Sequence, residues 1–196
     1  MKLPCALLLI ASSAIAPACA AQTIPNMNAD TSSHEVEIYA GGDVGTDGVG
    51  TRIPNWNLGV RYGWMLTDRH NERFYSTRFE YAMDVVPVFM NFQRNGPSYG
   101  VEFDPVVLKW NASPHRGLQP FLEISFGIAE SNIRTPPATS RFNFTPNATG
   151  GVRILRGRYD WSIGIRYFHF SNADLEPNNP GDNSVGIRIA VSKWLK

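Results

Sequence analysis

Residues 56–64 read WNLGVRYGW, in which large apolar residues occupy every even position. The odd positions hold Asn57, Gly59, Arg61 and Gly63, which are polar or small. Successive side chains of a β-strand point to opposite faces, so this segment predicts a strand with one apolar face and one polar face.

The same two-residue period recurs along the chain, and long helical periodicity is missing. The strands that we expect cover residues 34–41, 56–65, 74–89, 97–107, 118–131, 141–154, 159–170 and 184–195. Eight is the smallest even number of strands found in bacterial outer-membrane barrels. The sequence therefore predicts an all-β protein whose residues 21–196 form one eight-stranded antiparallel transmembrane β-barrel.

The polar face of these strands carries both bases and acids, and this indicates which face is inside. Opposite charges can pair within a narrow lumen, whereas large aliphatic and aromatic side chains suit contact with lipid. The groups that we expect to form structural pairs in the lumen are Arg61, Arg78, Glu80, Asp84, Glu123, Arg166 and Arg188. A soluble lipocalin-like barrel, which buries its apolar face around a ligand, is the alternative, because a two-residue period does not identify the inner face.

The lengths of the connections predict the orientation in the membrane. The connections 66–73, 108–117 and 155–158 are of short or moderate length, whereas 42–55, 90–96, 132–140 and 171–183 are mostly longer and rich in Gly, Pro and Asn. Long loops of such barrels face the outside of the cell and short turns face the periplasm. The strand at 159–170 is thus expected to end at the outer leaflet.

The first twenty residues predict export. Lys2 precedes the apolar stretch 7–11, and the small-residue segment 16–21 offers cleavage after Ala20 or Ala21, as in a secretory signal peptide. A lipoprotein acylated at Cys19 is a weaker interpretation, because the residues before it match the usual motif poorly. The near balance of 18 Lys and Arg against 17 Asp and Glu gives no field that would attract nucleic acid.

His169 and Ser171, at the end of the strand at 159–170, are candidate catalytic residues. Residues i and i+2 of a strand share a face, and the parity of this pair matches that of Trp161, Ile163 and Ile165. Both are therefore expected on the lipid-facing exterior, where an imidazole beside a hydroxyl can activate it as a nucleophile. Ordinary interfacial residues at a strand end are the alternative.

The stretch RYFHFSNA at 166–173, followed by NPGDNS at 179–184, resembles the signature of the PagL family of outer-membrane lipid A 3-O-deacylases, also called acyloxyacyl hydrolases. PFLEI at 120–124, FNFTP at 142–146 and GGVR at 150–153 are also similar to that family.

The resemblance implies an eight-stranded barrel with a lipid-facing His-Ser-Glu triad, which hydrolyses the ester at position 3 of lipid A and releases a 3-hydroxy fatty acid. It implies Ser171 as the nucleophile, His169 as the general base and Asn172 as part of the oxyanion hole. It implies no metal and no cofactor, and it implies lipopolysaccharide of the outer membrane as substrate.

The chain departs from that family at the triad acid. In the best-known members the acid lies fourteen residues after the histidine, and here that position holds Asn183. Its parity places it outward, but it carries no charge. Asp182, which has the wrong parity, and Glu176 are possible substitutes. A weaker enzyme follows, or alternatively a non-enzymatic structural or adhesive barrel with a decayed site.

The remaining candidates for chemistry are weak. His34, His70 and His115 are isolated near expected strand ends or turns, which predicts surface positions. The acids Asp43, Asp47 and Asp104 lack the spacing of metal ligands.

Overall fold

The computed structural model describes residues 32–46, 53–68, 77–137 and 139–195. The expected signal peptide lies outside these residues, as do His70 and Asp47. Within the described ranges no helix is long and apolar enough to cross a membrane. The strands in these ranges are β1 (His34–Gly45), β2 (Pro54–Met65), β3 (Thr77–Gln93), β4 (Gly96–Ala112), β5 (Leu118–Ser131), β6 (Phe142–Phe144), β7 (Asn147–Ile154), β8 (Asp160–Phe170) and β9 (Asp182–Leu195).

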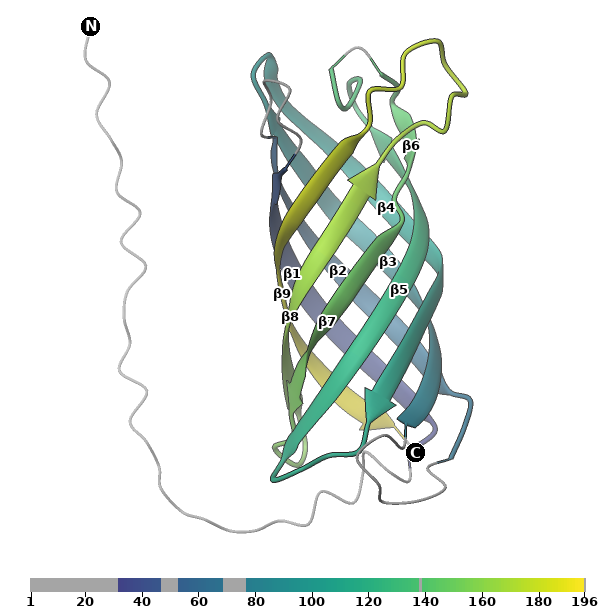
Figure 1. Cartoon of the computed structure of the whole chain (residues 1–196), viewed down its shortest axis with the longest axis vertical. Coiled ribbons are helices and arrows are strands. Elements are labelled where there is room, and N and C mark those ends of the chain that lie inside the picture. The colour runs from purple at the N-terminus through teal and green to yellow at the C-terminus, as the bar shows by residue number, and fades with distance from the viewer. Residues whose placement is uncertain (1–31, 47–52, 69–76, 138, 196) are drawn as a thin grey trace, which may run out of the picture.

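The strands form one closed antiparallel barrel (Figure 1). Consecutive strands pair with each other, except that β6 and β7 both pair with β5. β7 continues the circle to β8, and the pairings of β4 with β5 and of β1 with β9 close it. β6 and β7 together form one of eight barrel strands, so the predicted fold class is confirmed. In Figure 1 the connection from β8 to β9 and the short strand β6 lie at the upper end of the barrel.

The strand expected at 141–154 is interrupted between β6 and β7 by Thr145 and Pro146. Proline has no main-chain N–H and cannot contribute a donor to a β-ladder. The pairing nevertheless keeps one register on both sides, because Phe144 lies opposite Ile128 and Asn147 lies opposite Ser125. The interruption therefore leaves the predicted alternation of faces intact.

The connection expected at 90–96 is corrected by the structure. β3 continues to Gln93 and β4 begins at Gly96, so only a two-residue turn joins them. The register shifts between Val86 and Phe89, so that inward side chains come from even-numbered residues before the shift and from odd-numbered residues after it. Val86 and Phe89 both point into the barrel. Two-residue hairpin turns are common in antiparallel sheets, and the shift hid the alternation that continues past residue 89.

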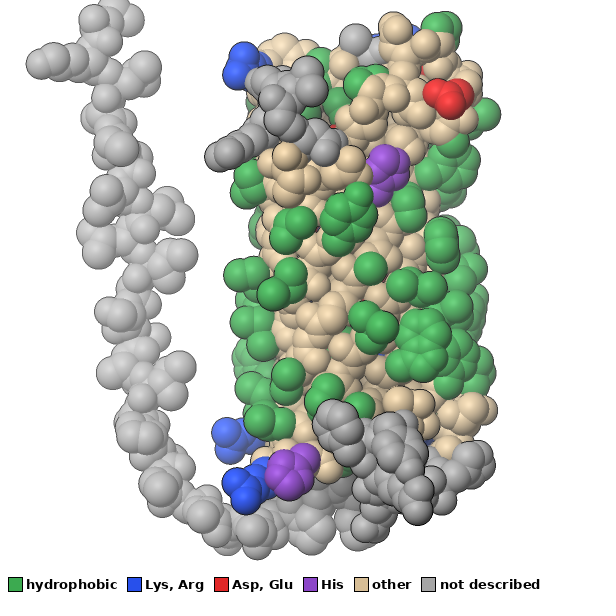
Figure 2. Space-filling model, in the orientation of Figure 1, with side chains coloured by type: hydrophobic (Ala, Val, Ile, Leu, Met, Phe, Trp, Pro, Cys, Tyr) green, Lys and Arg blue, Asp and Glu red, His purple; other side chains and the backbone are tan. Residues whose placement is uncertain are grey.

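The two faces of the barrel have opposite chemistry, as expected. Glu35, Glu37 and Arg61 on the inner face are at most 1% exposed, whereas Ile165 and Ile187 on the outer face are 68% and 56% exposed. On the side shown in Figure 2, hydrophobic side chains cover the wall of the barrel and charged side chains lie toward its two ends. A polar lumen within an apolar exterior identifies a transmembrane barrel of the outer-membrane type and argues against a lipocalin-like interior.

Ion pairs fill the middle of the lumen. Arg61 contacts Asp84 at 2.7 Å and Glu123 at 2.6 Å, and Arg153 contacts Glu35 at 2.6 Å. The predicted lumen groups Arg61, Asp84 and Glu123 therefore do pair. Arg153 and Glu35, which the sequence did not single out, form a further pair. In these pairs the buried charges are structural partners of one another.

Candidate active site

β8 carries His169 on its outer face, next to the end of the strand. The flanking Phe168 and Phe170 are only 1% and 2% exposed and point inward, whereas His169 is half-buried. The main-chain N–H of His169 donates to the carbonyl oxygen of Pro146 at 3.0 Å, and on the other side His169 lies opposite Asn183 of β9. Partners on both sides thus fix the backbone at this position.

A cluster of phenylalanines fills the lumen behind the histidine. Phe89 stacks on Phe170 with ring centroids 5.6 Å apart and lies 5.9 Å from the ring of Phe168. This part of the lumen thus holds an aromatic cluster among polar side chains, with the guanidinium of Arg166 5.1 Å from the ring centroid of Phe168. Close-packed aromatic rings are rigid, so they support the strand segment that presents His169.

Ser171 follows β8 and continues its alternation, with buried Phe170 before it and buried Asn172 after it. It exchanges two main-chain hydrogen bonds with Phe144 of β6, at 2.7 and 3.1 Å. Phe144 in turn lies opposite Ile128, which is 38% exposed on the outer face. Ser171 thus belongs to the same outer face as His169.

The two side chains share a face but are not bonded to each other. Among the described residues no hydrogen bond joins the imidazole of His169 to the hydroxyl of Ser171. Their positions are two residues apart, roughly 6.5 Å of strand rise, which leaning side chains can bridge. Hydrogen bonds between a catalytic base and its nucleophile are often long without substrate and shorten in the substrate complex.

The imidazole does have a partner on its other nitrogen. Nδ1 of His169 lies 2.7 Å from Oδ1 of Asn183, the residue at the position of the family's acid. An amide oxygen only accepts hydrogen bonds, so in this arrangement Nδ1 carries the proton and Nε2 presents its lone pair. That is the tautomer a general base requires.

The other two candidate acids are directed elsewhere. Asp182 begins β9 and is 8% exposed, on the inner side of the alternation. Glu176 accepts hydrogen bonds from Arg134 at 2.6 Å and from Ser140 at 3.2 Å. Glu176 therefore ties the connection after β8 to the connection before β6.

Asn172 organises the connection that follows the serine. Its side chain is 0% exposed, and its Nδ2 donates to the carbonyl of Asn178 while its Oδ1 accepts the main-chain N–H of Asp174, both at 2.9 Å. Asp174 and the preceding Ala173 have φ angles of 60° and 50°, which are uncommon for residues other than glycine. The bonds of Asn172 hold this left-handed turn directly behind Ser171.

Comparison with known proteins places this chain in a family. The model of the lipid A 3-O-deacylase (PagL) family matches residues 54–192, which is most of the chain and includes all four candidate site residues. The chain belongs to the PagL family. A comparison with curated protein sequences found no match.

Solved structures show the same barrel as this PagL-family chain. The crystal structure of the outer membrane enzyme PagL has a TM-score of 0.58 and 19% identity, covering 80% of this chain and 97% of that one. Neisserial surface protein A has a TM-score of 0.52 and 10% identity, covering 83% of this chain and 97% of that one. At such identities the likeness establishes the fold alone.

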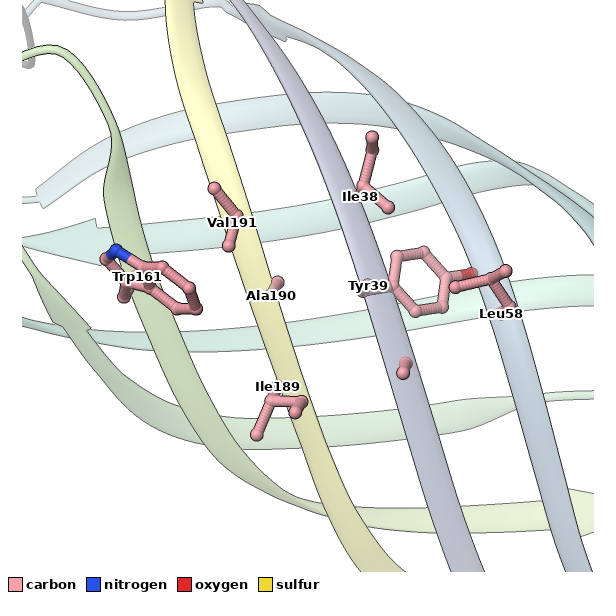
Figure 3. Close-up of a pocket in the computed structure, with 8 residues that line it drawn as sticks. Ile38, Tyr39, Leu58, Trp161, Ile189, Ala190 and Val191 are labelled. Atoms are coloured by element: carbon pink, nitrogen blue, oxygen red, sulfur yellow. The ribbon is translucent and has the colours of Figure 1, made fainter. Parts of the chain in front are cut away.

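A hollow in the barrel wall of this PagL-family chain lies well away from the site. It has a volume of about 200 Å³ and is drawn in Figure 3, where Trp161 borders it from β8, Ile189 from β9, and Ile38 and Leu58 from β1 and β2. Ile189 lies six residues along β9 from Asn183, roughly 20 Å by strand rise. The lining is almost entirely apolar, and Tyr39 is its one residue with a titratable side chain.

Among the described residues, the other histidines and the acids form no second site. The ring of His34 lies 3.3 Å from the hydroxyl of Tyr62, and His115 pairs through its main chain with Leu118 in a tight turn. In the part of the chain that the structure describes, no group of three or more His, Cys, Asp or Glu side chains could hold a metal ion.

Two residues near the imidazole were missed by sequence reasoning. Tyr167 donates its hydroxyl to Oδ1 of Asn183 at 2.5 Å. A Cβ added to Gly181, whose φ is +62°, would lie 3.4 Å from Cε1 of His169. The parity of Tyr167 with His169 was a usable signal for the first contact, whereas nothing in the sequence revealed the second.

Proposed function

We propose that this protein is an outer-membrane serine esterase that hydrolyses the 3-O-linked acyl ester of lipid A and releases a 3-hydroxy fatty acid. Membership of the PagL family supports the substrate class. The observation that carries the proposal is the outward position of His169 and Ser171, with Nδ1 of His169 bound to Asn183.

The position of the pair on the barrel suits a lipid substrate. Polar side chains on a lipid-facing surface cost free energy, so those found there usually have a function. In the proposed orientation, the end of β8 lies at the outer leaflet, where the acyl esters of lipopolysaccharide are found. The substrate then reaches Ser171 from the membrane side of the barrel wall rather than through the lumen.

The reaction follows from the roles of the groups. Nε2 of His169 takes the proton of the Ser171 hydroxyl as its oxygen bonds to the ester carbonyl carbon. The tetrahedral intermediate collapses when the bond to the sugar oxygen breaks, and that oxygen receives the proton from His169. Water, deprotonated by His169, then attacks the carbonyl carbon of the acyl-serine. The bond to the serine oxygen breaks, that oxygen receives the proton from His169, and the fatty acid is released.

Asn172 belongs to the proposal as the residue that builds the oxyanion hole. Donors placed where charge develops are commonly the largest single contribution to acyl transfer. In the described conformation the Asn172 side chain is buried and holds the turn behind Ser171. We therefore assign its contribution mainly to shaping the main chain that faces the intermediate.

Asn183 takes the position of the triad acid in this proposal. It orients His169 but stabilises an imidazolium less well than a carboxylate does. In serine proteases the Asp-to-Asn change at the corresponding position lowers turnover about 10⁴-fold, because the histidine takes the wrong tautomer. Here Oδ1 of Asn183 already holds the required tautomer, so the gain expected from Asn183→Asp is better stabilisation of the imidazolium and therefore a higher turnover.

Mass spectrometry of lipid A from cells that produce the protein tests the proposal. The expected result is loss of one 3-hydroxyacyl chain, abolished by Ser171→Ala and by His169→Asn. Ser162→Ala, on the inner side of the same strand, and His115→Asn, in a distant turn, serve as matched controls and should leave the product unchanged.

The competing function is a non-enzymatic structural or adhesive barrel, which the uncharged Asn183 favours. An unchanged lipid A profile, from cells in which the folded protein is verified in the outer membrane, supports that alternative and contradicts the esterase.

A further inference from the structure

Two hydrogen bonds converge on one atom beside the candidate site. Oδ1 of Asn183 lies 2.7 Å from Nδ1 of His169 and accepts the hydroxyl of Tyr167 at 2.5 Å. His169 lies directly opposite Asn183, and Tyr167 lies opposite the next outward residue of β9, Val185. The three side chains thus form a connected row on the outer faces of β8 and β9.

The amide at position 183 creates a problem that a carboxylate does not have. A carboxylate presents an acceptor in either orientation, whereas an amide presents an acceptor on one side and a donor on the other. If the amide of Asn183 were reversed, its nitrogen would donate to Nδ1 of His169. The imidazole proton would then sit on Nε2, and the base would lose its lone pair for the serine.

We propose that Tyr167 is a positioning residue that keeps the amide oxygen of Asn183 turned toward His169. This inference rests on the proposed function. A phenol is a better donor than acceptor, because its ring withdraws density from the oxygen. Donation from Tyr167 therefore favours the orientation in which Oδ1 faces both partners.

The short contact itself argues for more than an anchoring role. Tyrosines often line the interfacial girdle of membrane barrels, where the ring sits among headgroups. Tyr167 is 47% exposed, as such a residue would be, yet its hydroxyl is bound to a neighbouring strand. Tyr99, which is 51% exposed on the outer face, provides a comparison, because its hydroxyl makes no hydrogen bond among the described residues.

Four proteins separate the positioning role from a structural one: the wild type, Tyr167→Phe, Asn183→Asp, and the double variant. We expect Tyr167→Phe to lower kcat about tenfold with little change in KM when position 183 is Asn. With Asp at position 183 the same change should cost less than about twofold, because a carboxylate has no wrong orientation. Tyr99→Phe controls for general loss of an exterior tyrosine hydroxyl and should have no effect.

The tautomer of His169 can be determined by NMR without measuring enzymatic activity. In ¹⁵N-histidine-labelled protein, with the His169 signals assigned through His169→Asn, we expect the Nδ1–H form in the wild type. We expect a mixture with the Nε2–H form in Tyr167→Phe and recovery of the Nδ1–H form in the double variant. An unchanged tautomer in Tyr167→Phe overturns the inference, as does an equal loss of kcat in both backgrounds.

The two readouts also distinguish the inference from the proposed function. A tautomer that depends on Tyr167, in a protein that leaves lipid A intact, supports the positioning role and refutes the esterase. Esterase activity that Tyr167→Phe leaves unaltered, with no change of tautomer, refutes the positioning role alone. Folding of each variant is checked by the shift in electrophoretic mobility between unheated and heated barrel.

Discussion

Replacing Glu123 by Gln should destabilise the barrel strongly, because Glu123 is the central acid of the lumen network. It is 1% exposed and accepts hydrogen bonds from Arg61 at 2.6 Å and from Arg188. Removing one partner from a buried ion pair costs about 3–5 kcal/mol, since the other charge is left unpaired away from water. We expect about 3 kcal/mol, because Arg61 keeps two bonds to Asp84 and Arg188 keeps Glu37.

The same strand offers a matched control on its other face. Glu130 pairs with Arg141 at 3.3 Å, but the two side chains are 49% and 58% exposed. Exposed pairs contribute about 0–1 kcal/mol because water and salt screen them. Glu130→Gln should therefore change the free energy of unfolding by less than about 1 kcal/mol.

Equilibrium unfolding by urea in lipid vesicles, followed by tryptophan fluorescence, measures both variants. The difference between them should be about 2–3 kcal/mol, and the cost of Glu123→Gln should persist in high salt because a buried pair is little screened. Equal costs for the two substitutions would refute the assignment of the charged face to the lumen.

Three further predictions concern the connection that follows the serine. Asn172→Ala removes two buried hydrogen bonds, about 1 kcal/mol each, and should speed amide hydrogen exchange in this connection while lowering kcat at least tenfold. Gly181→Ala strains a positive φ next to His169, so kcat should decrease about tenfold without loss of barrel stability in urea. Glu176→Gln breaks only an exposed pair with Arg134 and should leave kcat within about twofold; a large loss would instead identify Glu176 as the triad acid.

The barrel itself could be predicted from the sequence because the strands alternate over most of their length, apart from local shifts of register. A one-residue error of register exchanges the two faces, so the placement of Arg61 or Ile165 is fixed wherever one face is charged and the other apolar. The inward faces of β3 and β8 near the upper end were harder to predict. There Phe89, Phe168 and Phe170 point into the lumen and erase the contrast of polarity on which the argument depends.

The site could be predicted only as far as parity and spacing reach. Parity placed His169, Ser171 and Asn183 on one outer face, and the structure pairs His169 with Asn183 directly. The hydrogen bond from Tyr167 and the contact at Gly181 depend on side-chain rotamers and on the path of the chain between β8 and β9. A two-residue period carries no information on either contact, so both were found only in the structure.

The central claim is that a nucleophile and a base work together on the barrel exterior. Its most direct test is to expose the purified protein to a long-chain alkyl phosphonate, which labels activated serines, and to measure the intact mass of the protein. The account predicts a single adduct, located at Ser171 by peptide mapping, that is lost in His169→Asn and retained in His115→Asn. A folded barrel that remains unlabelled, or one labelled equally without His169, would contradict it.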